Sequence, residues 1–324
     1  MAERLRLGTR GSKLALAQAD MAKAALEARF PDAEVELCVV KTGGDKDRAR
    51  SLVSIGGSGV FVKELEEALL AGEVDFAVHS LKDVPDMIDE RLTLAAFLPR
   101  DLPNDVLVSG GATLFELPEG AKVGTGSPRR VLQLNVLRPD IRCVDLRGNL
   151  ETRLSKVEAG ELDAVVLGGA GLVRLGLDSR ITETFPARLV TPAVGQGIIA
   201  LECLAENDNI LDLLSEVNDP NAKLAANVER VWMRFLGGGC RVPMAAFLEP
   251  ECGEEDVGYR FYAYLADPAT KLFYKAEEFF EAEKFGKEAL LEFAGGFVQK
   301  CKELGIPLPC EVGENALLNF WDNY

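Results

Sequence analysis

An eight-residue pattern occurs twice in the chain and constrains the fold more than any other feature. Residues 71–78 read AGEVDFAV and residues 159–166 read AGELDAVV. Each copy ends a predicted helix at a glycine, passes an acidic residue and enters an apolar strand. This local pattern is common, but a polar or glycine-rich segment also follows both strands, at 79–83 and 168–171. Together these similarities favour two similar α/β lobes.

The first of these strands, predicted at 74–78, stops abruptly in polar residues. The segment HSLKD follows it, and Pro85 prevents the strand from continuing. In α/β proteins the carboxyl ends of parallel strands are where ligands bind, so Lys82 and Asp83 form a candidate site. The alternative is an ordinary solvated turn, and these residues alone leave both interpretations open.

The length of 324 residues allows two or three domains. We expect a first α/β lobe from residues 1–98 and 196–217, a second from 99–195, and a smaller α+β domain from 218–324. A predicted strand at 195–203 returns to the first lobe, so two segments cross between the lobes. Residues 42–59 are rich in glycine and charge, which predicts a long mobile loop, and residues 298–324 show no clear pattern.

The remaining predicted elements follow from apolar periodicity and from Gly, Pro and capping residues. Strands are predicted at 4–8, 35–40, 106–109, 122–124, 141–144, 259–265 and 272–280. Helices are predicted at 12–29, 60–71, 129–137, 150–159 and 221–235.

The formal net charge of −16 argues against nucleic acid and anionic membranes as partners, because the long-range field repels both. No apolar run approaches the length of a membrane span, and residues 1–9 lack a signal-peptide core, so we expect a cytoplasmic protein. The seven cysteines are odd in number and contain no CxxC pair, and the chain has a single histidine. This composition argues against a disulfide framework and against a metal site.

Arginines nevertheless gather at predicted strand ends. The segment GTGSPRR at 124–130 places Ser127, Arg129 and Arg130 at a strand end and helix start, and Arg147 and Arg153 follow the next strand. A helix start, hydroxyl groups and guanidinium forks together suit a ligand that carries carboxylates. We infer a polyanion site, with surface ion pairing as the alternative.

Two further segments extend this interpretation. Arg10 and Ser12 lie between the first predicted strand and helix, where backbone donors favour an anion, although Arg10 could simply be solvated. Arg174 fits the same pattern or simply ends a short helix.

The loop GGGCRVP at 237–243 contains the cysteine with the most distinctive setting. Its glycines permit close approach of a ligand, and the neighbouring Arg241 favours the thiolate of Cys240. The alternative is a structural loop cysteine.

These segments resemble one family, the porphobilinogen deaminases or hydroxymethylbilane synthases. The resemblance covers residues 5–243 and rests on the order and spacing of several motifs. They are RLGTRGSKLALAQ, VDFAVHSLKDVP, VGTGSPRR, DLRGNLETRLSK, AGLVRLGL, PAVGQG and GGGCRVP.

The resemblance implies a transferase of tetrapyrrole (heme) biosynthesis. It would join four molecules of porphobilinogen head to tail, release ammonia at each step and yield hydroxymethylbilane. The implied fold is α/β, with two lobes like those of periplasmic binding proteins and a third, smaller α+β domain. The implied protein is a monomer whose partner is this small-molecule substrate.

The resemblance also implies residue roles. Asp83 would be catalytic, and Cys240 would carry a dipyrromethane cofactor through a thioether. The residues implied to bind the cofactor are Cys240, Lys82, Ser127, Arg129, Arg130 and Arg147. The residues implied to bind substrate are Arg10, Ser12, Arg153 and Arg174.

Three positions depart from the family pattern. Ser58 stands where many relatives have lysine, Gly168 and Gly169 replace bulkier residues, and Gly238 stands where an acidic residue is common. Two other functions therefore stay open: a two-lobed solute-binding or sensor protein, and a catalytically silent homologue. A solute-binding protein would need neither the cofactor cysteine nor the Lys82–Asp83 pair.

Overall fold

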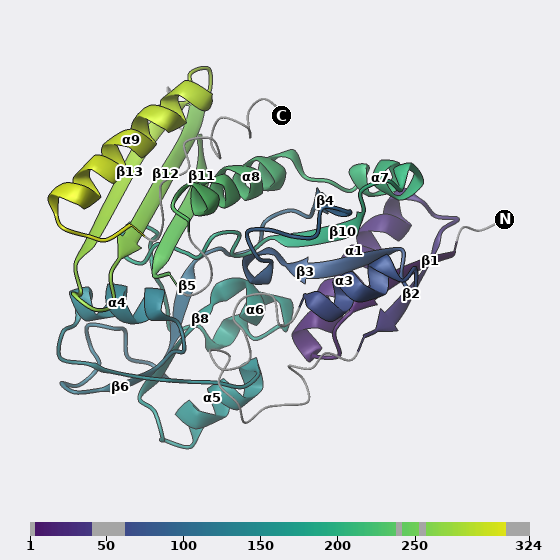
Figure 1. Cartoon of the computed structure of the whole chain (residues 1–324). Helices are drawn as coiled ribbons and strands as arrows, with labels where there is room; N and C mark the ends of the chain where they lie inside the picture. The colour runs from purple at the N-terminus through teal and green to yellow at the C-terminus, as the bar shows by residue number, and fades with distance from the viewer. Residues whose placement is uncertain (1–3, 41–61, 238–241, 253–256, 309–324) are drawn as a thin grey trace. The chain divides into compact units, whose positions relative to one another are not determined.

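The computed structural model describes residues 4–40, 62–237, 242–252 and 257–308 (Figure 1). The chain divides into two compact units, which are described separately. The first contains residues 1–103, 170–178 and 196–226, and the second contains residues 104–169, 179–195 and 227–324. No helix in the described ranges combines the length and hydrophobicity needed to cross a membrane.

The first unit is built on a five-stranded sheet. From one edge to the other, its strands are β2 (Glu34–Val39), β1 (Arg4–Thr9), β3 (Phe76–Ser80), β10 (Ile199–Leu204) and β4 (Leu92–Phe97). β2, β1 and β3 are parallel, whereas β10 is antiparallel to both β3 and β4. Its helices are α1 (Lys13–Arg29), α3 (Lys63–Leu70) and α7 (Asp208–Ser215). Leu7, Phe76 and Leu201 form the core with Leu26 of α1.

The second unit contains a sheet with the same arrangement. Its strands are β7 (Arg142–Val144), β6 (Lys122–Gly124), β8 (Ala164–Gly168), β5 (Asp105–Val108) and β9 (Glu183–Thr184). β7, β6 and β8 are parallel, and β5 is antiparallel to β8. Its helices α4 (Pro128–Leu137) and α5 (Leu150–Glu158) follow β6 and β7. The two copies of the repeated pattern thus lead into β3 and β8, which are both the third strand of their sheet, and the expected pair of similar α/β lobes is confirmed.

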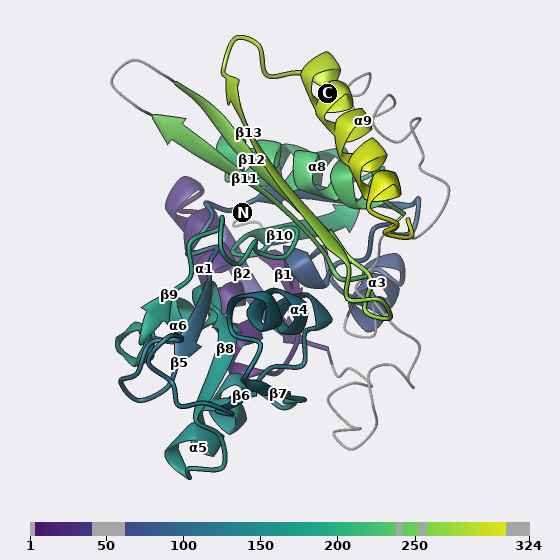
Figure 2. The same ribbon diagram turned by 90° about the vertical axis from the view of Figure 1, so that its left-hand side faces the viewer.

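A third, antiparallel sheet also belongs to the second unit. Its strands are β11 (Met244–Cys252), β12 (Val257–Ala266) and β13 (Phe273–Glu281), and α9 (Lys287–Glu303) lies along it in Figure 2. Trp232, in α8 (Pro220–Phe235), contacts Phe261, Phe293 and Phe297, which gives this sheet an aromatic core. The mixed α/β fold class with a smaller extra sheet is therefore confirmed, while the predicted boundaries of three domains stay a prediction.

Several elements differ from expectation. The predicted strand at 195–203 begins only at Ile199, because Gly195 and Gly197 adopt positive φ angles of 69° and 91° in a turn. β3 continues through His79 and Ser80, because β10 pairs with both residues. The elements β4, β9, β11, α7 and α9 were not predicted from the sequence, and α6 (Gly169–Arg174) is the short helix that the alternative interpretation of Arg174 required. The predicted loop at 42–59, with Ser58, lies outside the described residues.

Candidate functional site

Two adjacent strand ends of the first sheet bring together residues from distant parts of the sequence. β1 and β3 are parallel neighbours, with Leu7 opposite Phe76 and Gly8 opposite Ala77. Arg10 and Ser12 therefore follow β1 at the same edge at which Lys82 and Asp83 follow β3. Ser12 caps α1 by accepting a hydrogen bond from the backbone N–H of Ala15 at 3.2 Å.

The turn that carries Asp83 is well supported by its backbone. It is a single 3₁₀ turn, Leu81–Asp83, and the N–H of Leu81 donates to the carbonyl of Ile198 at 3.0 Å. Lys82 is half-buried, and its Nζ lies 3.3 Å from Oε1 of Gln196. The Asp83 side chain is exposed. A carboxylate is thus available to a ligand from a backbone that is held in place.

A buried polar pair lies behind this edge. His79 is 5% exposed, and its Nε2 lies 2.9 Å from Oε2 of Glu202, which is completely buried. A second carboxyl group, that of Glu66, interacts electrostatically with this pair. Burial raises the pKa of Glu66, and the charge of Glu202 raises it further. The only histidine of the sequence is therefore an internal residue and not a surface ligand.

The second sheet brings together the loops that follow β6 and β7. The N–H of Thr125 donates to the carbonyl of Val144 at 2.9 Å, and a Cβ atom at Gly126 would lie 3.0 Å from the carbonyl oxygen of Leu146. Ser127 caps α4, and Asn149 caps α5. The amino ends of both helices therefore point their backbone donors toward this edge.

Arg147 and Arg153 follow β7 and remain accessible. The side chain of Arg147 is 42% exposed, and its Nε donates to Asp145 at 3.0 Å. Arg153 is half-buried, and its Nε donates to the carbonyl of Gly148 at 2.9 Å. The contact of Arg147 uses one guanidinium nitrogen, so this exposed side chain can still present a bidentate fork to a carboxylate.

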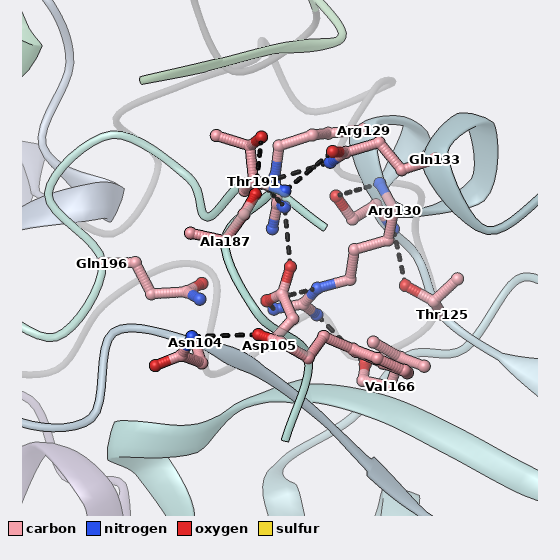
Figure 3. A network of polar contacts seen from close by, with 12 residues as sticks. Asn104, Asp105, Thr125, Arg129, Arg130, Gln133, Val166, Ala187, Thr191 and Gln196 are labelled. Atoms are coloured by element: carbon pink, nitrogen blue, oxygen red, sulfur yellow. Dashed lines mark hydrogen bonds and ion pairs between the residues drawn. The ribbon is translucent and has the colours of Figure 1, made fainter. Parts of the chain in front are cut away.

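Arg129 and Arg130 are placed differently, because they share the buried carboxylate of Asp105 (Figure 3). Nη1 of Arg129 lies 2.6 Å from Asp105 and 2.5 Å from the carbonyl of Thr191. Nε and Nη2 of Arg130 donate to the carboxylate of Asp105 at 3.0 and 2.8 Å, and its Nη1 donates to the backbone carbonyl of Val166. Burial alone would raise the pKa of Asp105, but the two guanidinium groups outweigh it and hold that pKa well below its usual range.

Arg174 is also engaged inside the protein. Its side chain is 4% exposed, with Nε 2.8 Å from the carboxylate of Asp101 and Nη2 2.6 Å from the carbonyl of Gly197. The six arginines expected to bind anions therefore divide into two groups. Arg10, Arg147 and Arg153 are half-buried or exposed, whereas Arg129, Arg130 and Arg174 are buried beside aspartates.

Asp101 and Asp105 were not singled out from the sequence. Asp105 begins a strand and Asp101 lies in a proline-flanked segment, which are both ordinary positions for an aspartate, and the only available signal was the number of arginines that needed a counter-charge. Cys240 and Arg241 lie outside the described residues.

A family model described as "Porphobilinogen deaminase, dipyromethane cofactor binding domain" matches residues 5–212, more than half of the chain. This chain belongs to the porphobilinogen deaminase family. The porphobilinogen deaminase of Syntrophomonas wolfei is 47% identical over 251 residues, which cover 77% of this chain and 82% of that protein. The porphobilinogen deaminase of Geotalea uraniireducens is 42% identical over 304 residues, which cover 94% of this chain and 89% of that protein.

Solved structures with similarity to this porphobilinogen deaminase family member include a periplasmic solute-binding protein from Desulfovibrio salexigens. The two are 11% identical, with a TM-score of 0.42, over 71% of this chain and 76% of that one.

Proposed function

We propose that this chain joins four molecules of porphobilinogen head to tail, with loss of ammonia at each step, to give hydroxymethylbilane for tetrapyrrole biosynthesis. The match of the family model over residues 5–212 carries this proposal. The two sheet edges support it, because one presents an exposed carboxylate and the other presents accessible arginines.

Asp83 is the proposed catalytic group. Loss of ammonia from the aminomethyl carbon of porphobilinogen leaves a cation that is delocalised onto the pyrrole nitrogen. A carboxylate held by the Leu81–Asp83 turn can stabilise this charge and accept a pyrrole proton. Such preorganised electrostatic stabilisation is commonly worth about 3 to 4 kcal/mol.

The arginines would hold the acidic side chains of the substrate and the growing chain. Each pyrrole unit brings two carboxylates, so the cationic residues must accept more negative charge at every step. Arg10, Arg147 and Arg153 can form direct bidentate contacts. Arg129 and Arg130 share one aspartate, so this triad keeps a net charge of +1 at a fixed position near the start of α4.

The residues of the second sheet edge fit a dipyrromethane cofactor, whose acetate and propionate groups need cationic and backbone donors. Gly126 lets the loops after β6 and β7 approach closely, and the amino ends of α4 and α5 supply N–H groups together with Ser127 and Arg147. Cys240 is the proposed point of attachment through a thioether. When bound, the cofactor supplies the terminal pyrrole carbon to which the first substrate unit is joined.

We further infer a cytoplasmic monomer with the three domains expected from the sequence.

The decisive experiment measures formation of hydroxymethylbilane from porphobilinogen by the purified chain, read as uroporphyrin after acid cyclisation and oxidation. A solute-binding protein would bind porphobilinogen without consuming it, and a silent homologue would release no ammonia. Either result would reject the proposed function.

A further inference from the structure

Gln196 has the most constrained side chain near the proposed catalytic turn. It is 1% exposed, its Oε1 accepts from Nζ of Lys82 at 3.3 Å, and its Nε2 donates to the carbonyl of Pro103 at 2.6 Å. An ammonium group can only donate and a carbonyl oxygen can only accept, so the amide cannot be rotated without losing both contacts. The side chain therefore directs its oxygen toward Lys82.

The backbone that presents Gln196 is fixed as well. Nε of Arg100 donates to the carbonyl of Gln196 at 2.9 Å, and the N–H of Asp101 donates to the carbonyl of Gly197 at 3.0 Å. Gly197 has a φ of 91°, and a Cβ atom there would lie 2.5 Å from the carbonyl oxygen of Asp101. This position requires glycine because two backbone segments meet there.

Arg174 completes the arrangement. Its Nε contacts the carboxylate of Asp101 and its Nη2 contacts the carbonyl of Gly197, so one guanidinium group joins both backbone segments. Burial lowers the pKa of Arg174, while the hydrogen bond and charge of Asp101 oppose this effect. A buried arginine in such a contact is suited to hold a turn in place.

We propose that Gln196 is a positioning residue for Lys82, and that Arg174 holds the Gln196–Gly197 turn through Asp101 and Gly197. The inference rests on the proposed function only for what Lys82 does, which is to hold a substrate carboxylate. It places Arg174 among the residues that support the site, and not among those that contact substrate.

The test measures how fast the Lys82 amine reacts with acetic anhydride in the full chain, read by peptide mass spectrometry at one pH. In Gln196→Leu the ammonium loses the Gln196 acceptor, so the reactive neutral amine is favoured and labelling should be about three- to tenfold faster. In Gln196→Glu a carboxylate stabilises the ammonium, so labelling should be slower than in the parent. If Gln196 had only a structural role, its two substitutions would not change the labelling rate of Lys82 in opposite directions.

Controls separate this effect from a general loss of packing. Gln133 is another buried glutamine, in the second unit. Its amide nitrogen donates to the carbonyl of Thr191, and its amide oxygen accepts from the N–H of Thr191. Gln133→Leu should leave Lys82 labelling unchanged. Exposed Lys63 serves as the internal reference for reagent activity.

Arg174→Met tests the second half of the proposal. Loss of the hydrogen bond from Arg174 to the carbonyl of Gly197 should also accelerate labelling of Lys82. Arg29→Met, which removes an exposed ion pair with Glu216 in the same unit, should not. Unchanged labelling in Arg174→Met would remove its positioning role.

Equal labelling in Gln196→Leu, Gln196→Glu and the parent would overturn the role of Gln196. If Gln196→Leu does not fold, Gln196→Glu decides alone, because labelling as fast as in the parent would contradict the contact. Normal turnover in Lys82→Met would instead reject the function proposed for Lys82, while the labelling result would stand.

Discussion

At the scale of single residues, Asp83 combines an exposed carboxylate with a fixed backbone. We expect Asp83→Asn to lower kcat about a hundred- to a thousandfold, because the amide keeps the shape but not the charge that faces the substrate cation. The melting temperature should not change, since the side chain buries no contact. Turnover of porphobilinogen and thermal unfolding, measured on the same preparation, check this prediction.

The matched control for Asp83 is Glu90→Gln, which removes another exposed carboxylate a few residues later. It should leave kcat within error of the parent. A purified Asp83→Asn protein that turns over within about tenfold of the parent would exclude Asp83 from catalysis.

Arg147→Leu and Arg153→Leu should weaken substrate binding without unfolding the protein, because both side chains lie at a strand end and a first helical turn. Loss of a bidentate contact should cost on the order of 2 kcal/mol, or about thirtyfold in KM. Arg142→Leu is the control, since this exposed arginine begins β7 at the opposite end of the same strand. Similar KM values in all three variants would contradict the assignment.

Asp105 should matter for stability. Asp105→Asn leaves the two buried guanidinium groups without their shared carboxylate and should cost about 3 to 5 kcal/mol of the free energy of unfolding. Asp89→Asn, which breaks the exposed pair with Arg91, should cost far less. Urea unfolding at pH 7 distinguishes the two.

The pKa of Asp105 also predicts an effect of acid. Because the folded-state pKa lies below that of the unfolded chain, the contribution of Asp105 is complete above about pH 4 and is lost as the pH falls further. Stability of the parent should therefore fall more steeply below pH 4 than that of Asp105→Asn. Parallel pH curves for the two proteins would show that the triad does not carry this charge.

At the scale of elements, the loop between β7 and α5 determines where Arg147 and Arg153 lie. Gly148 has a φ of 104°, and a Cβ atom there would lie 3.0 Å from Thr152. Gly148→Ala should therefore cost about 1 to 3 kcal/mol of stability and also raise KM, because Arg153 donates to the carbonyl of this glycine.

Gly160→Ala provides the comparison for Gly148. Gly160 has a φ of 68° with no atom near its missing Cβ, and it ends α5 away from the loop after β7. It should lose stability from backbone strain, on the order of 1 kcal/mol, with KM unchanged. Equal KM values in the two variants would mean that the loop geometry does not control binding.

At the scale of the whole molecule, covalent attachment of the cofactor is the property that separates an active family member from a binding protein. The intact mass of the parent should exceed the sequence mass by one dipyrromethane, and Ehrlich's reagent should colour it. Cys240→Ser should show the sequence mass and no turnover, because an oxygen ether is a poor substitute for the thioether. Cys252→Ser is the control, and a mass increment that survives in Cys240→Ser would place the attachment elsewhere.

The sequence by itself determined many of the local elements and the residues at their ends. Apolar runs followed by Gly, Pro and polar residues predict strand ends, because these signals act over a few neighbouring positions. The repeated pattern at 71–78 and 159–166 likewise predicted two similar sheets, and both copies lead into the third strand of a sheet.

Only the tertiary structure decided which arginines pair with aspartates inside the protein. Arg129 and Arg130 lie 24 and 25 residues from Asp105, and Arg174 lies 73 residues from Asp101. These pairs form because the strand order brings distant segments together and removes them from water, and neither effect is encoded in the spacing of nearby residues. Burial places three of the predicted anion-binding arginines in internal ion pairs, whereas Arg147 is exposed and Arg153 half-buried beyond the end of β7, and the binding role of all five stays a prediction.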